Sequence, residues 1–206
     1  PDQARILATP KHYTYLKVSE GCNHRCSFCV IPHIRGDLKS RTVESITTGI
    51  KNQLMQGVKE FNFIAQDLNE YGFDLKDKTN LAGLINAVDK IKGDYWVRLH
   101  YMYPLEFTQN LIDTIAASQH VAKYIDMPLQ HVNDRILLSM RRGSGSRYIR
   151  QLLSKLNLAM PDLTLRTTFI VGYPGETEAE FAELESFVKE GHFSHVGVFK
   201  YSVEET

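Results

Sequence analysis

Short runs of β-branched and aromatic residues alternate along the chain with stretches in which apolar residues recur every three or four positions. Runs of the first kind predict strands, and the spacing of the second kind predicts amphipathic helices. The predicted strands are 13–18, 60–65, 95–101, 123–129, 164–172 and 195–201. Because parallel strands need a crossover that is usually a helix, six strand–helix steps predict an α/β fold with a parallel sheet.

Helical periodicity fills the segments between these strands. The apolar positions at helical spacing are Val43, Ile46, Ile50 and Leu54; Leu81, Leu84, Ile85, Val88 and Ile91; Leu111, Ile112 and Ile115; and Phe181, Leu184 and Val188, with further helical pieces at 134–140 and 146–160. Thr42 is expected to cap the first helix, because its hydroxyl can accept a bond from a free backbone N–H group. Gly57 and Gly93 are expected to end the first two helices.

The number of units decides between barrel architectures. Eight βα units close a full barrel, whereas this chain shows six, so we expect an incomplete, TIM-like (βα)6 barrel with the helices outside. No linker rich in Pro, Gly or Ser divides the chain, so residues 1–206 predict a single domain. In such folds the chemistry gathers at the C-terminal ends of the strands, which directs attention to the stretch after the first strand.

Composition narrows the range of partners. The chain has 24 basic and 24 acidic side chains, so its bulk charge favours neither nucleic acid nor a membrane surface. No apolar run reaches the roughly 18 residues expected of a membrane-spanning helix. The first residues show neither a signal-peptide pattern nor an initiator Met, so we expect a cytoplasmic fragment or processed piece.

All three cysteines of the chain, Cys22, Cys26 and Cys29, fall within eight residues directly after the first predicted strand. Three cysteines cannot all pair internally, and one loop cluster is not a secreted disulfide framework, so metal ligation is the favoured interpretation. A structural zinc ion needs a fourth ligand, for which His24 and His33 are nearby candidates. An iron–sulfur cubane has four irons, so three thiolates would leave one iron open to a substrate. Incidental buried thiols are the remaining alternative.

The C-x3-C-x2-C spacing, with the aromatic Phe28 before the last cysteine and a strand in front, resembles the radical S-adenosylmethionine (SAM) superfamily. The resemblance implies a 4Fe–4S cluster held by Cys22, Cys26 and Cys29, with SAM chelating the open iron through its amino and carboxylate groups. It also implies that one-electron reduction cleaves SAM to methionine and a 5′-deoxyadenosyl radical. The usual fold of the superfamily is an incomplete barrel, which agrees with the six predicted units.

The sequence around the cysteines resembles the methylthiotransferase branch of this superfamily. The similar stretches are SEGCNHRCSFCVIPHIRGDLKSR, FIAQDLNEYG, RLHYMYP, YIDMPLQHVNDRILLSMRR, TTFIVGYPGETEAEF and YSVEET. The branch includes enzymes that modify tRNA bases and enzymes that add a methylthio group to the β-carbon of an aspartate in small-subunit ribosomal protein twelve. The chain is closer to the latter, since the tRNA enzymes usually carry Gln-Ser-Gly where it has Leu129-Gln130-His131.

The resemblance also implies which residues surround SAM. Many members of the superfamily carry Gly-Gly-Glu after the second strand, where this chain has Ala65, Gln66 and Asp67. Gln66 and Asp67 are therefore expected to line the site, with binding by the backbone alone as the alternative. Gly172 and Gly175 fall in a region that contacts the adenine in the superfamily, and an ordinary loop before a helix is the alternative.

Other polar residues are candidates by their chemistry. Arg166 lies in the fifth strand and suits bidentate binding of the SAM carboxylate, with a structural salt bridge as the alternative. Gln130, at the end of the fourth strand, is expected to bond the ribose hydroxyls. His100 and His131 are interpreted as packing histidines. The basic cluster formed by Arg135, Arg141 and Arg142 is interpreted as a solvated helix face, with a ribosome-binding surface as the alternative.

Full-length members of the branch carry an N-terminal domain whose auxiliary cluster supplies sulfur, and a C-terminal TRAM domain. Residues 1–206 match neither and are expected to be the central domain alone, which binds and cleaves SAM but does not insert sulfur unaided. The resemblance implies a ribosomal protein as substrate and a low-potential electron donor, with no membrane or nucleic acid partner for this domain. A tRNA-base methylthiotransferase and a non-enzymatic zinc or iron–sulfur module remain as alternatives.

Overall fold

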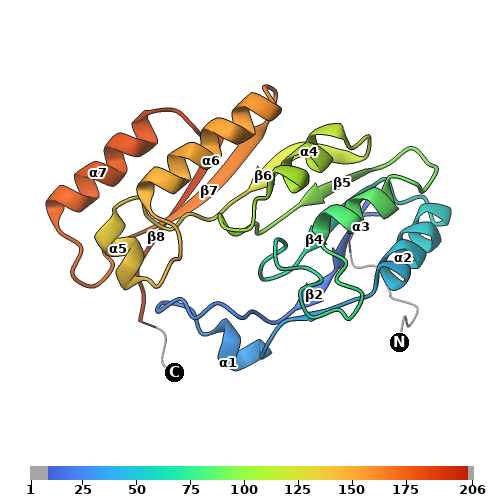
Figure 1. The fold of residues 1–206 in the computed structure, drawn as a ribbon, viewed down its shortest axis with the longest axis horizontal. Coiled ribbons are helices and arrows are strands. Elements are labelled where there is room, and N and C mark those ends of the chain that lie inside the picture. Colours follow the sequence, from blue (N-terminus) through green and yellow to red (C-terminus); the bar gives the residue numbers. More distant parts are fainter. Residues whose placement is uncertain (1–8, 204–206) are drawn as a thin grey trace.

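The computed structural model describes residues 9–203, and its centre is one curved sheet of six parallel strands (Figure 1). The strands are β1 (Tyr13–Lys17), β4 (Glu60–Ile64), β5 (Trp96–Leu99), β6 (Val121–Asp126), β7 (Thr164–Val171) and β8 (His195–Lys200). They pair in the order in which they occur in the chain, so that within the described residues β1 and β8 are the two edges of the sheet. The predicted fold class, an open (βα)6 barrel, is confirmed.

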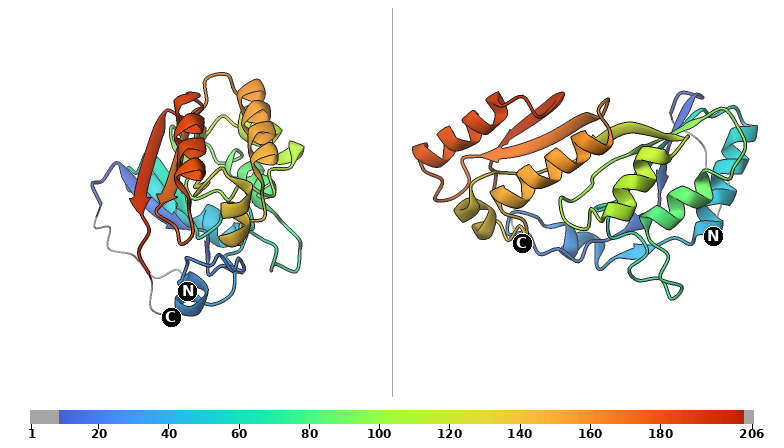
Figure 2. Two further views of the ribbon diagram at one scale, coloured as in Figure 1. Left: turned by 90° about the vertical axis from the view of Figure 1, so that its left-hand side faces the viewer. Right: turned by 45° about the horizontal axis from the view of Figure 1, so that its top comes forward.

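The longer helices lie along one face of this sheet, as two further views show (Figure 2). The helices that connect the strands are α2 (Val43–Met55), α3 (Leu81–Val88), α4 (Gln109–Ala117), α5 (Asp134–Ser139), α6 (Ser146–Ala159) and α7 (Glu178–Lys189). Thr42 caps α2 as predicted, because its side chain accepts a hydrogen bond from the N–H group of Ser45. Within residues 9–203 no helix is both long enough and apolar enough to cross a membrane.

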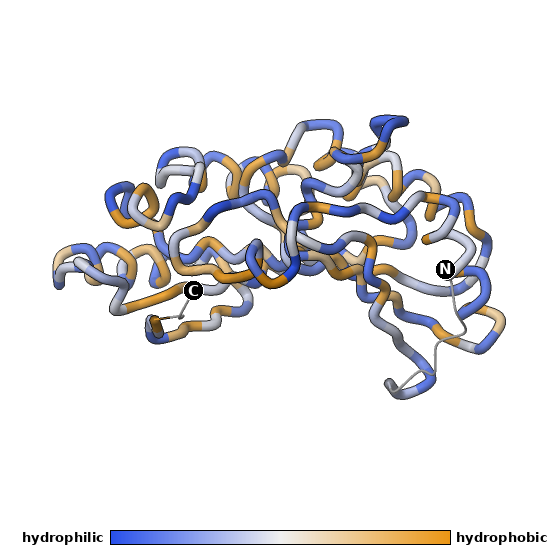
Figure 3. The backbone as a smooth tube through the Cα atoms, turned by 90° about the horizontal axis from the view of Figure 1, so that it is seen from below, coloured by the Kyte–Doolittle hydropathy of each residue, from blue (hydrophilic) through white to orange (hydrophobic). Residues whose placement is uncertain are grey.

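The core lies between the sheet and the helices. Phe61 and Phe63 of β4 and Val97 and Leu99 of β5 are completely buried, and they belong to the same cluster as the inner faces of the helices. Hydrophilic and hydrophobic residues are interspersed along the whole described backbone, as its hydropathy colouring shows (Figure 3). Because each element turns its apolar side to this core, the opposite face of the sheet is free to carry polar side chains.

Three short elements were not predicted, and all belong to the segment that carries the cysteines. They are β2 (Ser19–Glu20), α1 (Ile31–Arg35) and β3 (Lys39–Ser40). β2 and β3 pair in an antiparallel manner, with Ser19 opposite Ser40, and so close the cysteine segment into a loop. Elements of two to five residues are too short to show a hydrophobic period, which explains why the pattern did not predict them.

The fourth strand differs from its prediction, because β6 ends at Asp126 rather than at residue 129. Pro128 has no backbone N–H group and cannot continue the ladder. The chain rejoins the sheet at Gln130, which forms an isolated bridge with Phe169 and has a φ of +74°. Gln130 therefore lies beyond the strand, in a left-handed conformation that is uncommon for a residue with a side chain.

Candidate functional site

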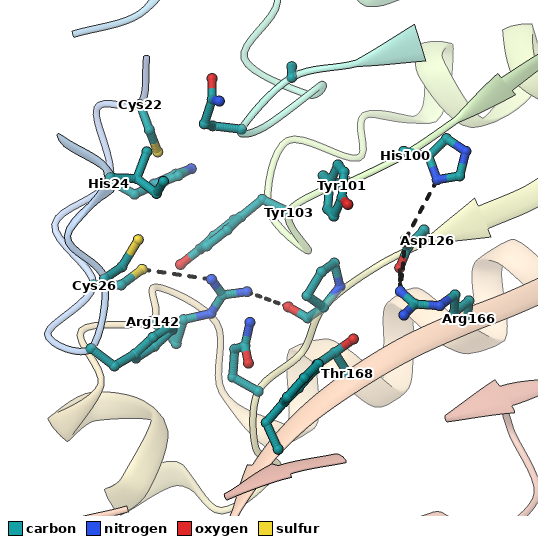
Figure 4. A pocket seen from close by; sticks show the side chains of 18 of the residues that line it. Cys22, His24, Cys26, His100, Tyr101, Tyr103, Asp126, Arg142, Arg166 and Thr168 are labelled. Atoms are coloured by element: carbon teal, nitrogen blue, oxygen red, sulfur yellow. Dashed lines mark hydrogen bonds and ion pairs between the residues drawn. The ribbon is translucent and has the colours of Figure 1, made fainter. Parts of the chain in front are cut away.

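A cavity of about 670 Å³ opens at the C-terminal ends of the strands (Figure 4). One wall is the cysteine loop, and Cys22, Cys26 and Cys29 all line the cavity. The other walls come from β6, β7 and β8 and from the segments that follow β4, β5 and β6. The volume lies within the range of about 300–1,000 Å³ that is typical of small-molecule sites.

The cysteine loop is shaped by backbone bonds at its neck. Gly21 has a φ of +82°, and the N–H group of Cys22 donates to the carbonyl oxygen of Gly36 at 3.1 Å. The Cys29 N–H group donates to the Cys26 carbonyl oxygen at 3.1 Å, which forms a turn between two of the cysteines. Local backbone geometry therefore turns all three cysteines toward one cavity.

Ser27 ties the far side of this loop to the opposite end of the sheet. Its hydroxyl donates to the carbonyl oxygen of Ser139 at 2.9 Å and shares a hydrogen bond of 2.8 Å with the Tyr173 hydroxyl. The Ser27 N–H group donates to the Met140 carbonyl oxygen at 3.2 Å. Phe28 packs against a small apolar cluster that includes Met140 and Tyr173. The aromatic residue before the third cysteine thus helps to fix the loop.

Burial controls the chemistry of Cys22. Removal from water raises the pKa of its thiol to about 11, an effect that the N–H group of His24 opposes and that Asp67 and Glu70 reinforce. Without a bound cation this cysteine is therefore a neutral thiol near pH 7. A metal ligand must be a thiolate, so metal binding at Cys22 must be accompanied by loss of its proton.

His24 connects the loop to the segment after β4. Its Nε2 atom lies 2.8 Å from Oδ2 of Asp67, and its ring stacks on Tyr103 with 4.0 Å between the ring centroids. Oδ1 of Asp67 accepts N–H bonds from Asn69 at 2.8 Å and Tyr103 at 3.2 Å. Asp67 is buried and does not line the cavity. Glu70 lies 3.7 Å from His24, and burial raises the pKa of its carboxyl.

Gln66, Gln130 and Arg166, three of the predicted SAM-binding residues, line the cavity. The Oε1 atom of Gln66 is buried and has no hydrogen-bond partner among the described residues. The backbone of Gln130 bonds to β7, donating to Thr168 and accepting from Ile170. A ligand with polar groups would satisfy the buried amide oxygen of Gln66, whose unmet bonding otherwise costs free energy.

Arg166 forms an ion pair inside this cavity. Its Nη1 atom donates to both carboxylate oxygens of Asp126, at 2.8 and 2.9 Å. His100 lines the cavity beside this pair, with Nε2 3.0 Å from Oδ1 of Asn62 and Nδ1 3.8 Å from Asp126. The salt bridge that was the alternative for Arg166 is present, and it coexists with a position on the cavity wall.

Gly172 and Gly175 do not line the cavity. The Gly172 N–H group donates to the carboxylate of Glu176, and the Gly175 carbonyl oxygen accepts from Arg135 at 2.7 Å. His131 is fully buried and bonds Glu176 at 3.2 Å, which fits the interpretation as a packing histidine. The contact of these two glycines with adenine remains a prediction that their position here does not support.

Sequence reasoning missed Arg142 as a cavity residue and His24 as an anchor of the loop, whereas Tyr103, which can be interpreted from its place after a strand as a pocket-rim or a core-edge residue, does line the cavity. Arg142 was assigned to a solvated helix face, yet it is only 9% exposed and lies over the Tyr103 ring at 3.9 Å. Arg135 and Arg141 are exposed. The pair Arg141-Arg142 carries no local signal that one side chain points inward.

The two histidines considered as zinc ligands lie in different surroundings. His33 is exposed on α1 and does not line the cavity. His24 lines the cavity, but its Nε2 atom is bonded to Asp67. The three cysteines are free of disulfides, and the buried amide of Gln66 lies in the same cavity. The residues present therefore fit a metal cluster held by three thiolates with a polar ligand beside it.

Comparison with protein families decides between these possibilities. The model of the radical SAM superfamily matches residues 16–188, which include all three cysteines, the end of β1 and the whole of β4, β5, β6 and β7. The chain belongs to the radical SAM superfamily. Membership implies a 4Fe–4S cluster and SAM, which agrees with the three thiols and the size of the cavity.

Curated relatives in this superfamily match nearly the whole chain. The ribosomal protein uS12 methylthiotransferases RimO of Syntrophotalea carbinolica and Aquifex aeolicus are 46% and 48% identical over 201 residues, 98% of the chain. The corresponding protein of Chlorobaculum tepidum is 49% identical over the same length. The chain spans about half the length of these relatives, 44% and 46% of the first two.

Solved structures of radical SAM enzymes share the fold. The methyltransferase TsrM from Kitasatospora setae superimposes with a TM-score of 0.75, covering 91% of this chain and 35% of TsrM, at 15% identity. Coproporphyrinogen III oxidase HemN from Escherichia coli gives a TM-score of 0.67, covering 95% of this chain and 46% of HemN, at 16% identity. At such identities the similarity establishes the open barrel and nothing about substrates.

Proposed function

We propose that this chain is the radical SAM domain of a methylthiotransferase that adds a methylthio group to the β-carbon of an aspartate in ribosomal protein uS12. The observation that carries the proposal is the 46–49% identity to curated uS12 methylthiotransferases over 98% of the chain. The site supports it, because the three cysteines line a cavity large enough for SAM and a substrate side chain.

The chain's own residues hold and orient the cofactors. Cys22, Cys26 and Cys29 would ligate the cluster as thiolates, and three ligands leave one iron for SAM. When bound, the cluster supplies the single electron that starts the radical chemistry of SAM. Ser27 and His24 fix the loop from two sides through their bonds to Tyr173 and Asp67. This loop forms one wall of the cavity and so limits the access of water from that side.

The cavity offers three polar groups for SAM. We propose that Gln66 and Gln130 bond its amino group and ribose, since both line the cavity and one amide oxygen is buried without a partner among the described residues. Arg166 binds Asp126 only through Nη1, so its other N–H groups are our candidates for the SAM carboxylate. Asp67 acts through His24 rather than by direct contact with SAM.

Sulfur insertion needs a source that these residues do not supply. The chain has three cysteines, and all three are assigned to one cluster. The relatives are about twice as long, and we propose that an auxiliary cluster in such additional sequence donates the sulfur. The proposed partners are the small-subunit ribosomal protein as substrate and a low-potential electron donor, and the proposed location is the cytoplasm, where ribosomes are assembled.

The test is anaerobic reconstitution of the chain with iron and sulfide, followed by metal analysis and assay of SAM cleavage under a strong reductant. We expect about four irons per chain and SAM cleavage, both lost in Cys26→Ala. His33→Ala is the matched control, because His33 lies on the neighbouring α1 but is exposed and outside the cavity. It should keep iron and activity, whereas a zinc site completed by His33 would lose its metal.

The substrate is tested with the longest natural form of the protein that contains these residues. Incubation with uS12 and, separately, with unmodified tRNA is followed by mass spectrometry for an added methylthio group. Modification of an aspartate in uS12 supports the proposal. Modification of tRNA alone would assign the chain to the tRNA branch, and stoichiometric zinc would contradict radical chemistry at this site altogether.

A further inference from the structure

The most unusual group in the cavity wall is the guanidinium of Arg142, which is buried without a carboxylate partner. Arg142 is 9% exposed, and no ion pair joins it to an acidic side chain within residues 9–203. Its Nη2 atom donates to the carbonyl oxygen of Pro128 at 2.6 Å, and its Nε atom is buried without a partner in the described part of the chain. A buried cation left in this condition is costly, because removal from water is not offset by an opposite charge.

The neighbours of Arg142 fix where its charge lies. The guanidinium lies over the Tyr103 ring at 3.9 Å, and the imidazole of His24 stacks on the same ring. Nη1 is directed at Sγ of Cys26, 3.7 Å away, a contact marked by the dashed line in Figure 4. The stack of Arg142, Tyr103 and His24 places the positive charge beside Cys26, a proposed cluster ligand.

Two acidic groups, Asp67 and Glu70, lie beside His24. Asp67 and Glu70 reinforce the raised pKa of Cys22, whereas the group beside Cys26 is a fixed cation. A cluster with three thiolate ligands carries net negative charge, and reduction increases it. The proposed cluster would therefore supply the negative partner that the described residues do not give to Arg142.

We propose that Arg142 is a positioning residue that offsets the negative charge of the cluster through Cys26 and thereby raises the reduction potential of the cluster. The proposal rests on the proposed radical SAM function, since it requires that the cluster is bound. Hydrogen bonds to the sulfurs of an iron–sulfur cluster and charges near it both change its reduction potential. The N–H donor and the positive charge of Arg142 would both stabilise the reduced cluster, because that state carries more negative charge.

The test is a redox titration of the reconstituted chain without SAM, followed by electron paramagnetic resonance. Arg142→Met removes the charge and the N–H donors at similar length. We expect the ratio of reduced to oxidised cluster at a fixed potential to fall at least tenfold, a shift of about 59 mV toward negative values for a one-electron couple. Arg142→Lys, which keeps the charge but not the planar stack, should give a smaller shift in the same direction.

Arg141→Gln is the matched control, because it removes the same charge from the adjacent, exposed position. It should titrate like the wild type. An Arg142→Met chain that holds wild-type iron and has the wild-type potential would overturn the proposal, as would an equal shift in Arg141→Gln. Failure of the wild type to bind iron would instead contradict the proposed function.

The apo chain gives a second readout in case Arg142→Met does not load with iron. Since the guanidinium has no anion beside it without the cluster, its removal should change the melting temperature of the apo chain by no more than about 4 °C. If Arg142→Met loses iron binding but keeps a nearly unchanged apo melting temperature, the result supports the proposal that Arg142 offsets the negative charge of the cluster. A large drop in the apo melting temperature would show that Arg142 serves the fold, and it would overturn the proposal.

Discussion

Gly21 shows how a single residue sets the geometry of the cysteine loop. Its φ is +82°, and a Cβ atom added there would lie 2.1 Å from the carbonyl oxygen of Asp37. The close approach of these two backbone segments allows Cys22 to bond Gly36. No side chain other than the hydrogen of glycine fits between them, because real Cβ contacts do not fall below about 3 Å.

We therefore expect Gly21→Ala to lower stability and to abolish iron uptake, since the loop neck must open to admit the methyl group. Gly36→Ala is the control, because Gly36 also has a positive φ, +72°, but an added Cβ meets nothing within 4 Å. Gly36 also has a ψ of −164°, a backbone region that is nearly restricted to glycine, so the control should cost backbone strain of about 1–3 kcal/mol but no steric clash. The two variants are compared by urea unfolding and by iron per chain, and equal behaviour would refute the steric argument.

The cysteines and Arg142 mark the limits of prediction for individual residues. The cysteines could be predicted as metal ligands because their signal is local, three thiols at fixed spacing after a strand. Arg142 could not, because its neighbours Tyr103, Pro128 and Cys26 come from three distant segments. Whether a charged side chain is buried depends on the residues that the fold places around it. Two adjacent arginines in a sequence do not indicate which of them will be buried.

At the level of elements, runs of β-branched and aromatic residues predicted every strand of the main sheet, with errors of up to three residues at the ends. The largest error is in β6, where Pro128 stops the ladder although Met127 and Leu129 are as apolar as a strand. The apolar character of Met127 and Leu129 indicates that they are buried, but it does not indicate whether their backbone groups bond to a neighbouring strand. Ladder bonds depend on the neighbouring strand, which sequence periodicity does not specify.

The start of α7 illustrates an element that charges stabilise. Thr177 and Glu180 form a capping box, and Arg135 of α5 bonds the same carboxylate. The Arg135 bond, followed by the bonds from Thr177, lowers the pKa of Glu180 to about 2 from a usual value of 4.5. A carboxyl group whose pKa is lower in the folded state stabilises the fold above pH 4.5, and this contribution is lost as the pH falls toward 2.

We expect Glu180→Gln to unfold at lower urea concentration than the wild type at pH 7, and this difference to shrink as the pH falls from 4.5 toward 2. Glu178→Gln is the matched control, since Glu178 lies in the same first turn of α7 but is exposed. It should differ little from the wild type at either pH. A deficit of Glu180→Gln that stayed constant with pH would show that the carboxylate charge is not the cause.

At the scale of the whole molecule, the cysteine loop spans an open barrel. His24 ties it to the segment after β4, and Ser27 ties it to α5 and to the segment after β7. The sheet itself does not depend on the loop, because its central strands are buried by the helices and by one another. The loop therefore joins the two ends of the barrel by a few polar bonds and the packing of Phe28, whereas the sheet is held by its large apolar core.

Because the loop and the sheet are held by different interactions, we expect removal of the cluster to loosen the loop and to leave the sheet unchanged. In hydrogen exchange followed by mass spectrometry, chelation of iron from the reconstituted chain should speed exchange in residues 21–38 and in the segments bonded to Ser27. Exchange in β4 and β5, whose Phe63 and Leu99 are completely buried, should not change. Cys26→Ala, treated identically, should show no change, since it has no cluster to lose. Faster exchange throughout β4 and β5 would mean that the cluster belongs to the folding core, because a loop held by a few polar bonds cannot protect strands that the apolar core already protects.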